Sequence, residues 1–274
     1  MSIEFKSLMI RLPHINLHAV EGGQGPLALM FHGITGSGYV FESVIEDLGG
    51  QFRCLSFDQR GHGRSDKPVS GYAARDFVED IAAIVRHLDA GPALLIGHSL
   101  GSRNALEAGA RYPNLVAGVV GIEFVPYIEA QVFDDLDARV ASGDRVFSSV
   151  EAIEAYLTGR YRLMPAESVS RRAKYGYWKA DAGWRPLADP RAMAQISKGL
   201  REDLEPVLKS IRVPTLLIRG AASKLVSPEA WARAKALRPD IPAVELEGAD
   251  HYVQEEVPRA VVREILSFSR MLKR

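Results

Sequence analysis

A serine between two glycines, directly after a short apolar run, constrains this chain more than any other feature. The motif Gly97-His98-Ser99-Leu100-Gly101 follows the apolar residues 93–96 and leads into 102–110, a run compatible with a helix. A nucleophile turn of the G-x-S-x-G type requires this context, because the glycines let the backbone turn sharply and expose the serine hydroxyl. A plain glycine-rich turn is the alternative interpretation. We expect Ser99 to be a nucleophile.

Short apolar runs alternate with amphipathic stretches along the chain, which predicts strands and helices that build a mainly parallel sheet. Residues 76–88 and 260–271 each carry apolar side chains on one helical stripe, as helices that cover a sheet do. Only Pro13 and His14 separate the first two expected strands, so we expect these two to form an antiparallel pair. The expected strands are 5–12, 15–19, 27–31, 54–57, 93–96, 116–122, 215–219 and 243–246.

The alternation of strands and helices is interrupted between about residues 126 and 204. This segment is rich in Ala, Arg and Asp, has helical periodicity near 150–157 and shows no convincing strand. A chain of 274 residues is expected to form one core with an insertion rather than two independent domains. We therefore predict a core of residues 1–125 and 205–274 and an inserted helical segment, 126–204, which we call the lid. It would overhang the carboxyl ends of the strands, where such sheets bind ligands.

Charge and composition exclude several classes of partner. Lys and Arg together number 34, as do Asp and Glu, so no overall field attracts a nucleic acid or an anionic membrane. No stretch approaches the roughly 18 uninterrupted apolar residues of a membrane span, and the start of the sequence does not read as a secretory leader. The single cysteine, Cys54, cannot form an internal disulfide. We predict a cytoplasmic protein with neither a nucleic-acid nor a membrane partner.

A serine hydroxyl is a weak nucleophile unless a neighbouring base accepts its proton. Of seven histidines, His251 lies between the last expected strand and the final helix, within Gly248-Ala249-Asp250-His251-Tyr252. That position in chain order is typical of the histidine in a serine, acid and histidine triad built on a parallel sheet. The other histidines are explained by turns or surface positions, and no pair has the spacing of a metal site. We expect His251 to be the base and the site to hold no metal.

A glycine-rich turn after an earlier strand, Phe31-His32-Gly33-Ile34-Thr35-Gly36, adds a further part of the expected site. Attack on a carbonyl group places negative charge on its oxygen, and backbone N–H groups must already point at that charge. We assign this oxyanion-hole role to the N–H groups of Ile34 and Leu100. A simple turn is the alternative for the first loop.

These segments together resemble the α/β-hydrolase superfamily and stand in its order over essentially the whole chain. The matching segments are 31–33, 58–65, 97–101 and 250–251. The resemblance implies the α/β-hydrolase fold: an eight-stranded, mostly parallel sheet with helices on both faces and an inserted helical lid. It also implies that Asp58 and Arg60 belong to a structural turn, so Asp58 receives no catalytic role.

The acid that would orient His251 is absent from the place where most members of the superfamily carry it. After residues 215–219 the sequence reads Gly220-Ala221-Ala222-Ser223-Lys224, without a carboxylate. A minority of the superfamily places the acid after the preceding core strand, and here Glu123 follows 116–122 directly. Its surroundings are apolar, so an unpaired carboxylate would be costly to bury, and the imidazole N–H of His251 would satisfy it. We expect Glu123 to be the triad acid.

Two alternatives to this acid stay open at the level of sequence. Glu123 could be a solvent-exposed glutamate at a strand end. Asp250 is the rival acid, but adjacent side chains on an extended loop usually diverge, which places it second. If Glu123 is the acid, Glu123→Gln is expected to cut turnover by orders of magnitude while Ser223→Ala matters little.

Within the superfamily the chain resembles the amidases of vitamin B6 catabolism that act on (E)-2-(acetamidomethylene)succinate. The matching segments are 123–129, 223–227 and 248–253, with 138–140, 155–157 and 159–161 in the lid. In those enzymes the acid also follows the earlier strand but is an aspartate, one methylene shorter than Glu123. The resemblance favours Arg139 and Arg160 as the residues that bind substrate carboxylates, with Tyr161 as a helper, over other lid arginines.

The expected activity is therefore that of a serine hydrolase that cleaves an amide bond of a small anionic substrate, a dicarboxylate, without a cofactor. A guanidinium group binds a carboxylate through two parallel hydrogen bonds, which suits such a substrate. Other hypotheses are a general carboxylesterase or lactonase, a ligand receptor with slow turnover, and a cofactor-free oxygenase, since one fold can host several functions. A homodimer is a further prediction.

Overall fold

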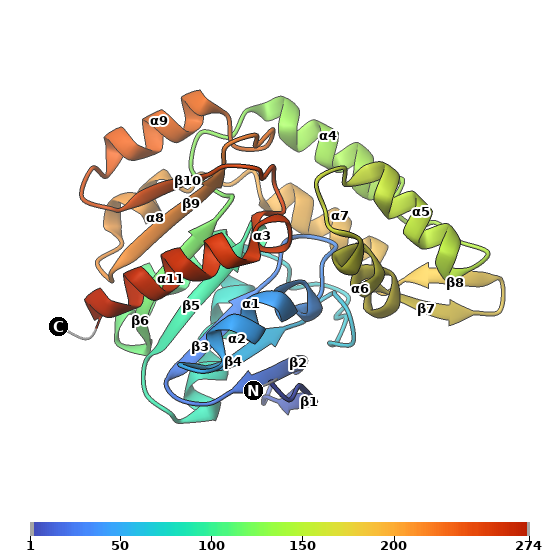
Figure 1. Cartoon of the computed structure of the whole chain (residues 1–274), viewed down its shortest axis with the longest axis horizontal. Helices are drawn as coiled ribbons and strands as arrows, with labels where there is room; N and C mark the ends of the chain where they lie inside the picture. The colour runs from blue at the N-terminus through green and yellow to red at the C-terminus, as the bar shows by residue number, and fades with distance from the viewer. Residues whose placement is uncertain (1–2, 273–274) are drawn as a thin grey trace.

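The computed structural model describes residues 3–272 and arranges them around an eight-stranded sheet (Figure 1). The order of strands across the sheet is β1-β2-β4-β3-β5-β6-β9-β10. The strands are β1 (Lys6–Arg11), β2 (Asn16–Gly23), β3 (Leu27–Phe31), β4 (Arg53–Phe57), β5 (Ala93–His98), β6 (Val116–Ile122), β9 (Thr215–Gly220) and β10 (Ala243–Leu246). Strand β2 pairs antiparallel with both β1 and β4, and the other neighbours pair in parallel. The expected mostly parallel sheet with an antiparallel opening pair is confirmed.

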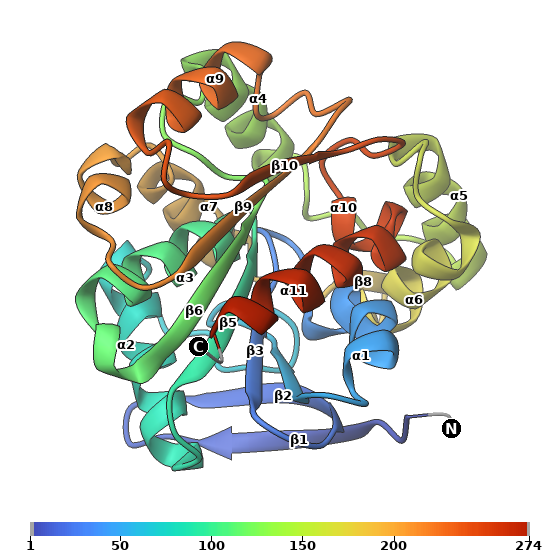
Figure 2. The same cartoon turned by 60° about the vertical axis from the view of Figure 1, so that its left-hand side comes forward.

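Helices cover both faces of this sheet (Figure 2). On one face α1 (Glu42–Leu48) packs against α11 (Pro258–Leu272), and on the other α3 (Leu100–Arg111) packs against α2 (Ala74–Leu88) and α8 (Glu205–Ser210). The remaining core helices are η1 (Gly38–Phe41), η2 (Pro113–Leu115), α9 (Pro228–Leu237) and α10 (Val253–Glu256). No helix within residues 3–272 combines the length and the apolar character needed to cross a membrane.

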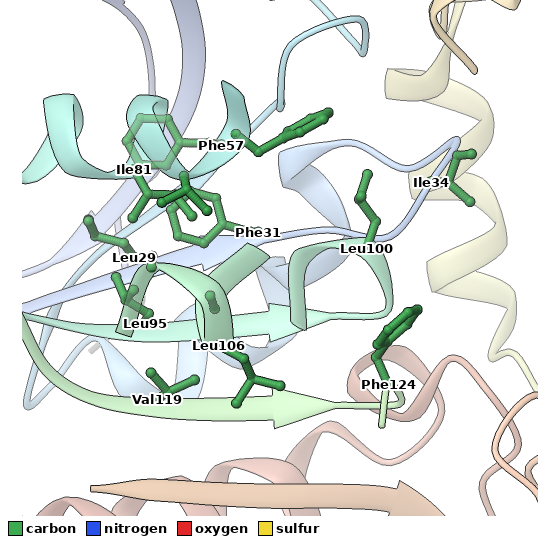
Figure 3. Packing of buried hydrophobic residues seen from close by; sticks show 14 of the residues in the cluster. Leu29, Phe31, Ile34, Phe57, Ile81, Leu95, Leu100, Leu106, Val119 and Phe124 are labelled. Atoms are coloured by element: carbon green, nitrogen blue, oxygen red, sulfur yellow. The ribbon is translucent and has the colours of Figure 1, made fainter. Parts of the chain in front are cut away.

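Strand β3 shows how the sequence builds both faces at once. Leu29 and Phe31 belong to the apolar cluster on the α2 side, while Met30 belongs to the cluster on the α1 side. Successive side chains of a strand point to opposite faces, and a strand covered on both faces therefore reads as one continuous apolar run. Figure 3 shows part of the first cluster, with Phe31 close to Ile81 of α2. Each such side chain stabilises the fold by about 1.5–3 kcal/mol when it is buried.

The lid holds four helices and a short hairpin. The helices are α4 (Ala130–Ala141), α5 (Val150–Arg160), α6 (Ala166–Gly176) and α7 (Pro190–Gly199), and the antiparallel strands β7 (Tyr177–Ala180) and β8 (Gly183–Pro186) lie between α6 and α7 (Figure 1). The expectation of a lid without strands is therefore wrong. Both strands have only four residues, and none of their side chains is fully buried. Such a pair shows neither an apolar run nor the alternation by which strands are recognised.

Candidate active site

The turn around Ser99 has the shape that exposes a nucleophile. Ser99 lies between β5 and α3 with φ 52° and ψ −115°. This backbone conformation costs a residue other than glycine about 1–3 kcal/mol and clusters at functional sites. Glycine is required on both sides: a Cβ on Gly97 would lie 2.1 Å from the carbonyl oxygen of Gly101, and a Cβ on Gly101 would lie 1.9 Å from that of Phe31.

The two expected oxyanion donors come from segments next to Ser99. Leu100 is the first residue of α3, where N–H groups have no partner inside the helix. Ile34 belongs to the loop after β3, which packs on the serine, since a Cβ on Gly33 would lie 3.1 Å from Cβ of Ser99. Figure 3 places Ile34 and Leu100 at the same end of the sheet. The structure brings both residues to the serine, and we propose that their N–H groups bind the oxyanion.

His251 lies in the loop between β10 and α10, beside the serine turn. Its carbonyl oxygen accepts a 2.7 Å hydrogen bond from Nε2 of His98, the residue before Ser99, and the centroids of the two rings are 4.6 Å apart. Burial lowers the pKa of His251 to about 3, and the positive charge of Arg139 adds to this effect. An imidazole that stays neutral is in the state that a general base requires.

Glu123 follows β6 and turns its carboxylate toward His251. Its Oε2 lies 3.1 Å from Nδ1 of His251, and its Oε1 accepts a 2.7 Å hydrogen bond from the N–H of Gly220. Burial raises the pKa of Glu123 to about 8, whereas hydrogen bonds from Ser223 and Gly220 act to lower it. Burial thus disfavours the charged form of both partners. An Nδ1–H donated to Glu123 leaves Nε2 of His251 as the proton acceptor, which is the tautomer that a triad uses.

The serine and the imidazole are not joined by a hydrogen bond. Within residues 3–272, His251 is hydrogen-bonded to His98 and Glu123 but not to Ser99. Catalytic hydrogen bonds often become short and well aligned only when substrate is in place, so this geometry does not exclude the pair. The role of Ser99, His251 and Glu123 as a triad is a proposal that rests on their arrangement.

Asp250, the rival acid, is engaged elsewhere. Its Oδ1 accepts a 3.0 Å hydrogen bond from the N–H of Lys224, and its own N–H donates to Glu256. Sequence reasoning missed Ser223, whose hydroxyl donates a 2.6 Å hydrogen bond to Oε2 of Glu123. The position that carries the acid in most of the superfamily therefore contacts Glu123, the proposed acid, here. Ser223 is part of the site, so the expectation that Ser223→Ala matters little has no structural support.

Two cavities lie under the lid, one beside the loop of His251 and one beside the loop of Ile34. The larger, about 360 Å³, is lined by His251 together with Lys224 and Tyr252. The smaller, about 100 Å³, lies against the oxyanion loop at residues 35–37. Three residues line both cavities: Arg139, Arg160 and Tyr161. The side chains expected to bind substrate thus stand where the two cavities meet.

Arg139 and Arg160 differ from the other arginines considered in the lid. Nε of Arg139 is buried without a hydrogen-bond partner among residues 3–272. Arg160 donates to the hydroxyl oxygens of Tyr161 and Tyr156 at 3.3 and 3.2 Å. Burial acts to raise the pKa of Tyr161, but nearby arginine charges outweigh it, so the pKa is lowered. Across the described residues 3–272, neither Arg139 nor Arg160 forms an ion pair with a carboxylate.

The arginines that the sequence ranked lower are occupied. Three of these arginines each form an ion pair with an acid: Arg171 with Glu42, Arg172 with Glu255 and Arg185 with Asp144. A guanidinium that is already neutralised by a carboxylate has less capacity to bind a second one. The distribution of partners therefore supports Arg139 and Arg160 as the anion-binding pair.

Comparison with known proteins agrees with this arrangement. A family model described as the alpha/beta hydrolase fold matches residues 26–258. The chain belongs to this family. The resemblance seen in the sequence motifs is thereby confirmed, and so is the expected fold.

Individual members of the α/β-hydrolase family give a narrower comparison. The chain is 48% identical over 267 residues to 2-(acetamidomethylene)succinate hydrolase from Mesorhizobium japonicum, covering 97% of this chain and 96% of the relative. It matches the crystal structure of an E-2-(acetamidomethylene)succinate hydrolase with a TM-score of 0.95 at 48% identity, over 97% of this chain and 100% of that one. Haloalkane dehalogenase 2 from Mycobacterium tuberculosis is 28% identical over 91% of this chain and 90% of the relative.

Proposed function

We propose that this protein is a serine hydrolase that cleaves the amide bond of (E)-2-(acetamidomethylene)succinate or a close analogue, as in vitamin B6 catabolism. The observation that carries this proposal is the pair Arg139 and Arg160, free of carboxylate partners in the described chain, beside His251 in the same cavity. Two guanidinium groups suit the two carboxylates of this substrate. The 48% identity to 2-(acetamidomethylene)succinate hydrolase supports the same substrate.

In the first half of the reaction, Oγ of Ser99 attacks the acetyl carbonyl carbon and His251 takes the hydroxyl proton. The negative charge on the carbonyl oxygen is held by the N–H groups of Ile34 and Leu100, and one such donor contributes about 3–4 kcal/mol. Glu123 stabilises the imidazolium. The C–N bond then breaks, His251 protonates the nitrogen, the enamine of the dicarboxylate leaves, and the acetyl group stays on Ser99.

In the second half, water replaces the departed amine. His251 takes a proton from the water, whose oxygen attacks the acetyl carbonyl, and the same N–H groups hold the charge again. The bond to Ser99 breaks, Ser99 regains its proton from His251, and acetate leaves. The sequence of steps needs no cofactor. A cytoplasmic location and a homodimer stay predictions.

Removal of each lid arginine tests the substrate class. Arg139→Ala and Arg160→Ala are each expected to lower kcat/KM for (E)-2-(acetamidomethylene)succinate by about 10–100-fold, since a hydrogen bond to a charged group contributes about 1.5–3 kcal/mol. Steady-state release of acetate measures this effect. Hydrolysis of p-nitrophenyl acetate, which lacks carboxylates, is expected to stay close to that of the unmodified protein. Arg185→Ala is the matched control because Arg185 lines neither cavity and is paired with Asp144.

Other outcomes of the same assays would contradict the proposal. A higher kcat/KM for the uncharged ester than for the dicarboxylate, with no loss in either arginine variant, would favour a general carboxylesterase or lactonase. Tight binding of the dicarboxylate with negligible turnover would favour a ligand receptor.

A further inference from the structure

Position 223 is where most of the superfamily carries the triad acid, and here it holds a serine that contacts the acid instead. Oγ of Ser223 lies 2.6 Å from Oε2 of Glu123, the same oxygen that lies 3.1 Å from Nδ1 of His251. The serine therefore acts on the imidazole only through the carboxylate.

The surroundings of Ser223 fix the direction of its hydroxyl proton. Its Oγ accepts a 3.1 Å hydrogen bond from the N–H of Val226, and its own N–H donates to the carbonyl oxygen of Gly220. Ser223 is only 7% exposed. A hydroxyl has one proton to donate, and with Val226 bound to a lone pair that proton is available to Glu123. A donated O–H favours the ionised form of the carboxyl group that accepts it.

Other charged groups near Glu123 act in both directions. The guanidinium of Arg219 on β9 favours the carboxylate, while Asp250 disfavours it, as does burial. The Glu256 carboxyl on α10, whose pKa burial raises to about 7, is a further acidic neighbour. The Glu123 carboxyl group forms direct hydrogen bonds with Ser223, Gly220 and His251. Ser223 is the one of these that a substitution can remove without touching the backbone or the base.

We propose that Ser223 is a positioning residue that aims the Glu123 carboxyl group at His251. A glutamate has one more rotatable bond than the aspartate of similar enzymes, so its carboxylate needs anchors to stay in one orientation. The N–H of Gly220 anchors Oε1, and the hydroxyl of Ser223 anchors Oε2. The inference rests on the proposed function, because it assumes that Glu123 orients the catalytic base.

Three variants test this role. Ser223→Ala is expected to lower kcat about 10–100-fold with KM unchanged, the factor expected when a hydrogen bond to a charged group is lost. The acid limb of the kcat profile is expected to move to higher pH, because the carboxyl loses a donor that lowers its pKa. Ser223→Thr keeps the hydroxyl, so its kcat and the acid limb of its pH profile are expected to match those of the unmodified protein. Ser227→Ala removes a hydroxyl from the same loop, where it caps α9, and is expected to leave kcat unchanged.

The assay can be made independent of the physiological substrate. Phenylmethylsulfonyl fluoride modifies an activated serine, so its rate of reaction reports on Ser99 even if the dicarboxylate is not turned over. A slower reaction in Ser223→Ala than in Ser227→Ala supports the positioning role, whichever substrate the protein uses. Failure of the amidase assay alone would instead count against the proposed function. Wild-type kcat, an unmoved acid limb and an unchanged rate of modification in Ser223→Ala would overturn the inference.

A second experiment moves the acid. The carboxyl carbon of an aspartate at position 223 would stand near the present Oγ, and its oxygens would reach about 1.2 Å farther, toward the place of Oε2 of Glu123. In the double variant Glu123→Ala, Ser223→Asp, phenylmethylsulfonyl fluoride is therefore expected to modify Ser99 at least about 10-fold faster than in Glu123→Ala, because the new carboxylate would again hold His251 in the tautomer that accepts the proton. Equal rates in the two variants would contradict the claim that residue 223 reaches the oxygen position that faces His251.

Discussion

Ser99, His251 and Glu123 can work as a unit only if one tautomer of the imidazole persists. The 3.1 Å contact between Nδ1 of His251 and Oε2 of Glu123 selects the tautomer whose Nε2 is free to accept a proton. Burial opposes charge on either group, so the carboxylate depends on the donors around it. At the residue scale the performance of the site therefore depends on how well Glu123 is held.

Replacement of this acid gives the strongest expected effect on the rate. Glu123→Gln preserves the shape of the side chain but lets the amide stabilise the wrong tautomer, and kcat is expected to fall by about 10²–10⁴-fold. Steady-state acetate release and circular dichroism together measure activity and fold. A variant that stays folded and keeps near-normal kcat would show that another group orients His251.

The same variant tests the pKa of the buried carboxyl through stability. Burial raises the pKa of Glu123 from 4.5 to about 8, so the folded protein holds the carboxyl proton more tightly than the unfolded chain does. The stability that results is fully present below pH 4.5 and is lost as the pH rises through about 8. A glutamine does not titrate. The free energy of unfolding of the unmodified protein is therefore expected to fall, relative to Glu123→Gln, between pH 4.5 and about 8. Urea denaturation at several pH values measures the difference, and a constant difference would rule out the raised pKa.

At the scale of elements, helix α6 joins the lid to the core. Two consecutive arginines on α6 pair with acids outside the lid, Arg171 with Glu42 of α1 and Arg172 with Glu255 of α10. The guanidinium of Arg172 also lies over the ring of Tyr252, 4.7 Å from its centroid. Helix α10 directly follows the loop of His251, so the attachment of α6 bears on the position of the base.

Loss of one of these pairs should be costly because it is buried. The side chain of Glu255 is fully buried and that of Arg172 is 11% exposed. Glu255→Ala would leave the guanidinium without its carboxylate, which typically costs about 3–5 kcal/mol. The midpoint of urea unfolding is expected to fall accordingly, whereas Glu264→Ala, which removes the partner of the largely exposed Arg263, should cost no more than about 1 kcal/mol. Equal, small losses in both variants would show that the α6 pair contributes little.

At the scale of the whole molecule, the order of apolar runs was enough to predict the sheet, because strands buried on both faces, such as β3 and β5, leave an unmistakable pattern. The serine turn was equally visible, since Gly97 and Gly101 have no sterically acceptable substitute. The hairpin of β7 and β8 could not be predicted, because half-buried four-residue strands carry no periodic signal.

The contact between Ser223 and Glu123 could not be predicted either. The two residues lie 100 positions apart and meet because β6 and β9 are neighbours in the sheet. Sequence reasoning could note that position 223 lacks an acid, but the register of two strands decides which side chains then touch. The sequence also could not predict which lid arginines lack a carboxylate partner. The acids that pair with Arg171 and Arg172, which are Glu42 and Glu255, come from distant parts of the chain.

The central claim is that Ser99 takes an acetyl group from a dicarboxylate amide. Rapid mixing with (E)-2-(acetamidomethylene)succinate, an acid quench and mass spectrometry of the digested protein test it most directly. We predict an acetyl group on the peptide that contains Ser99, formed before acetate accumulates and absent in Ser99→Ala. Turnover without any acylated Ser99, or an acyl group on a different residue, would contradict the account.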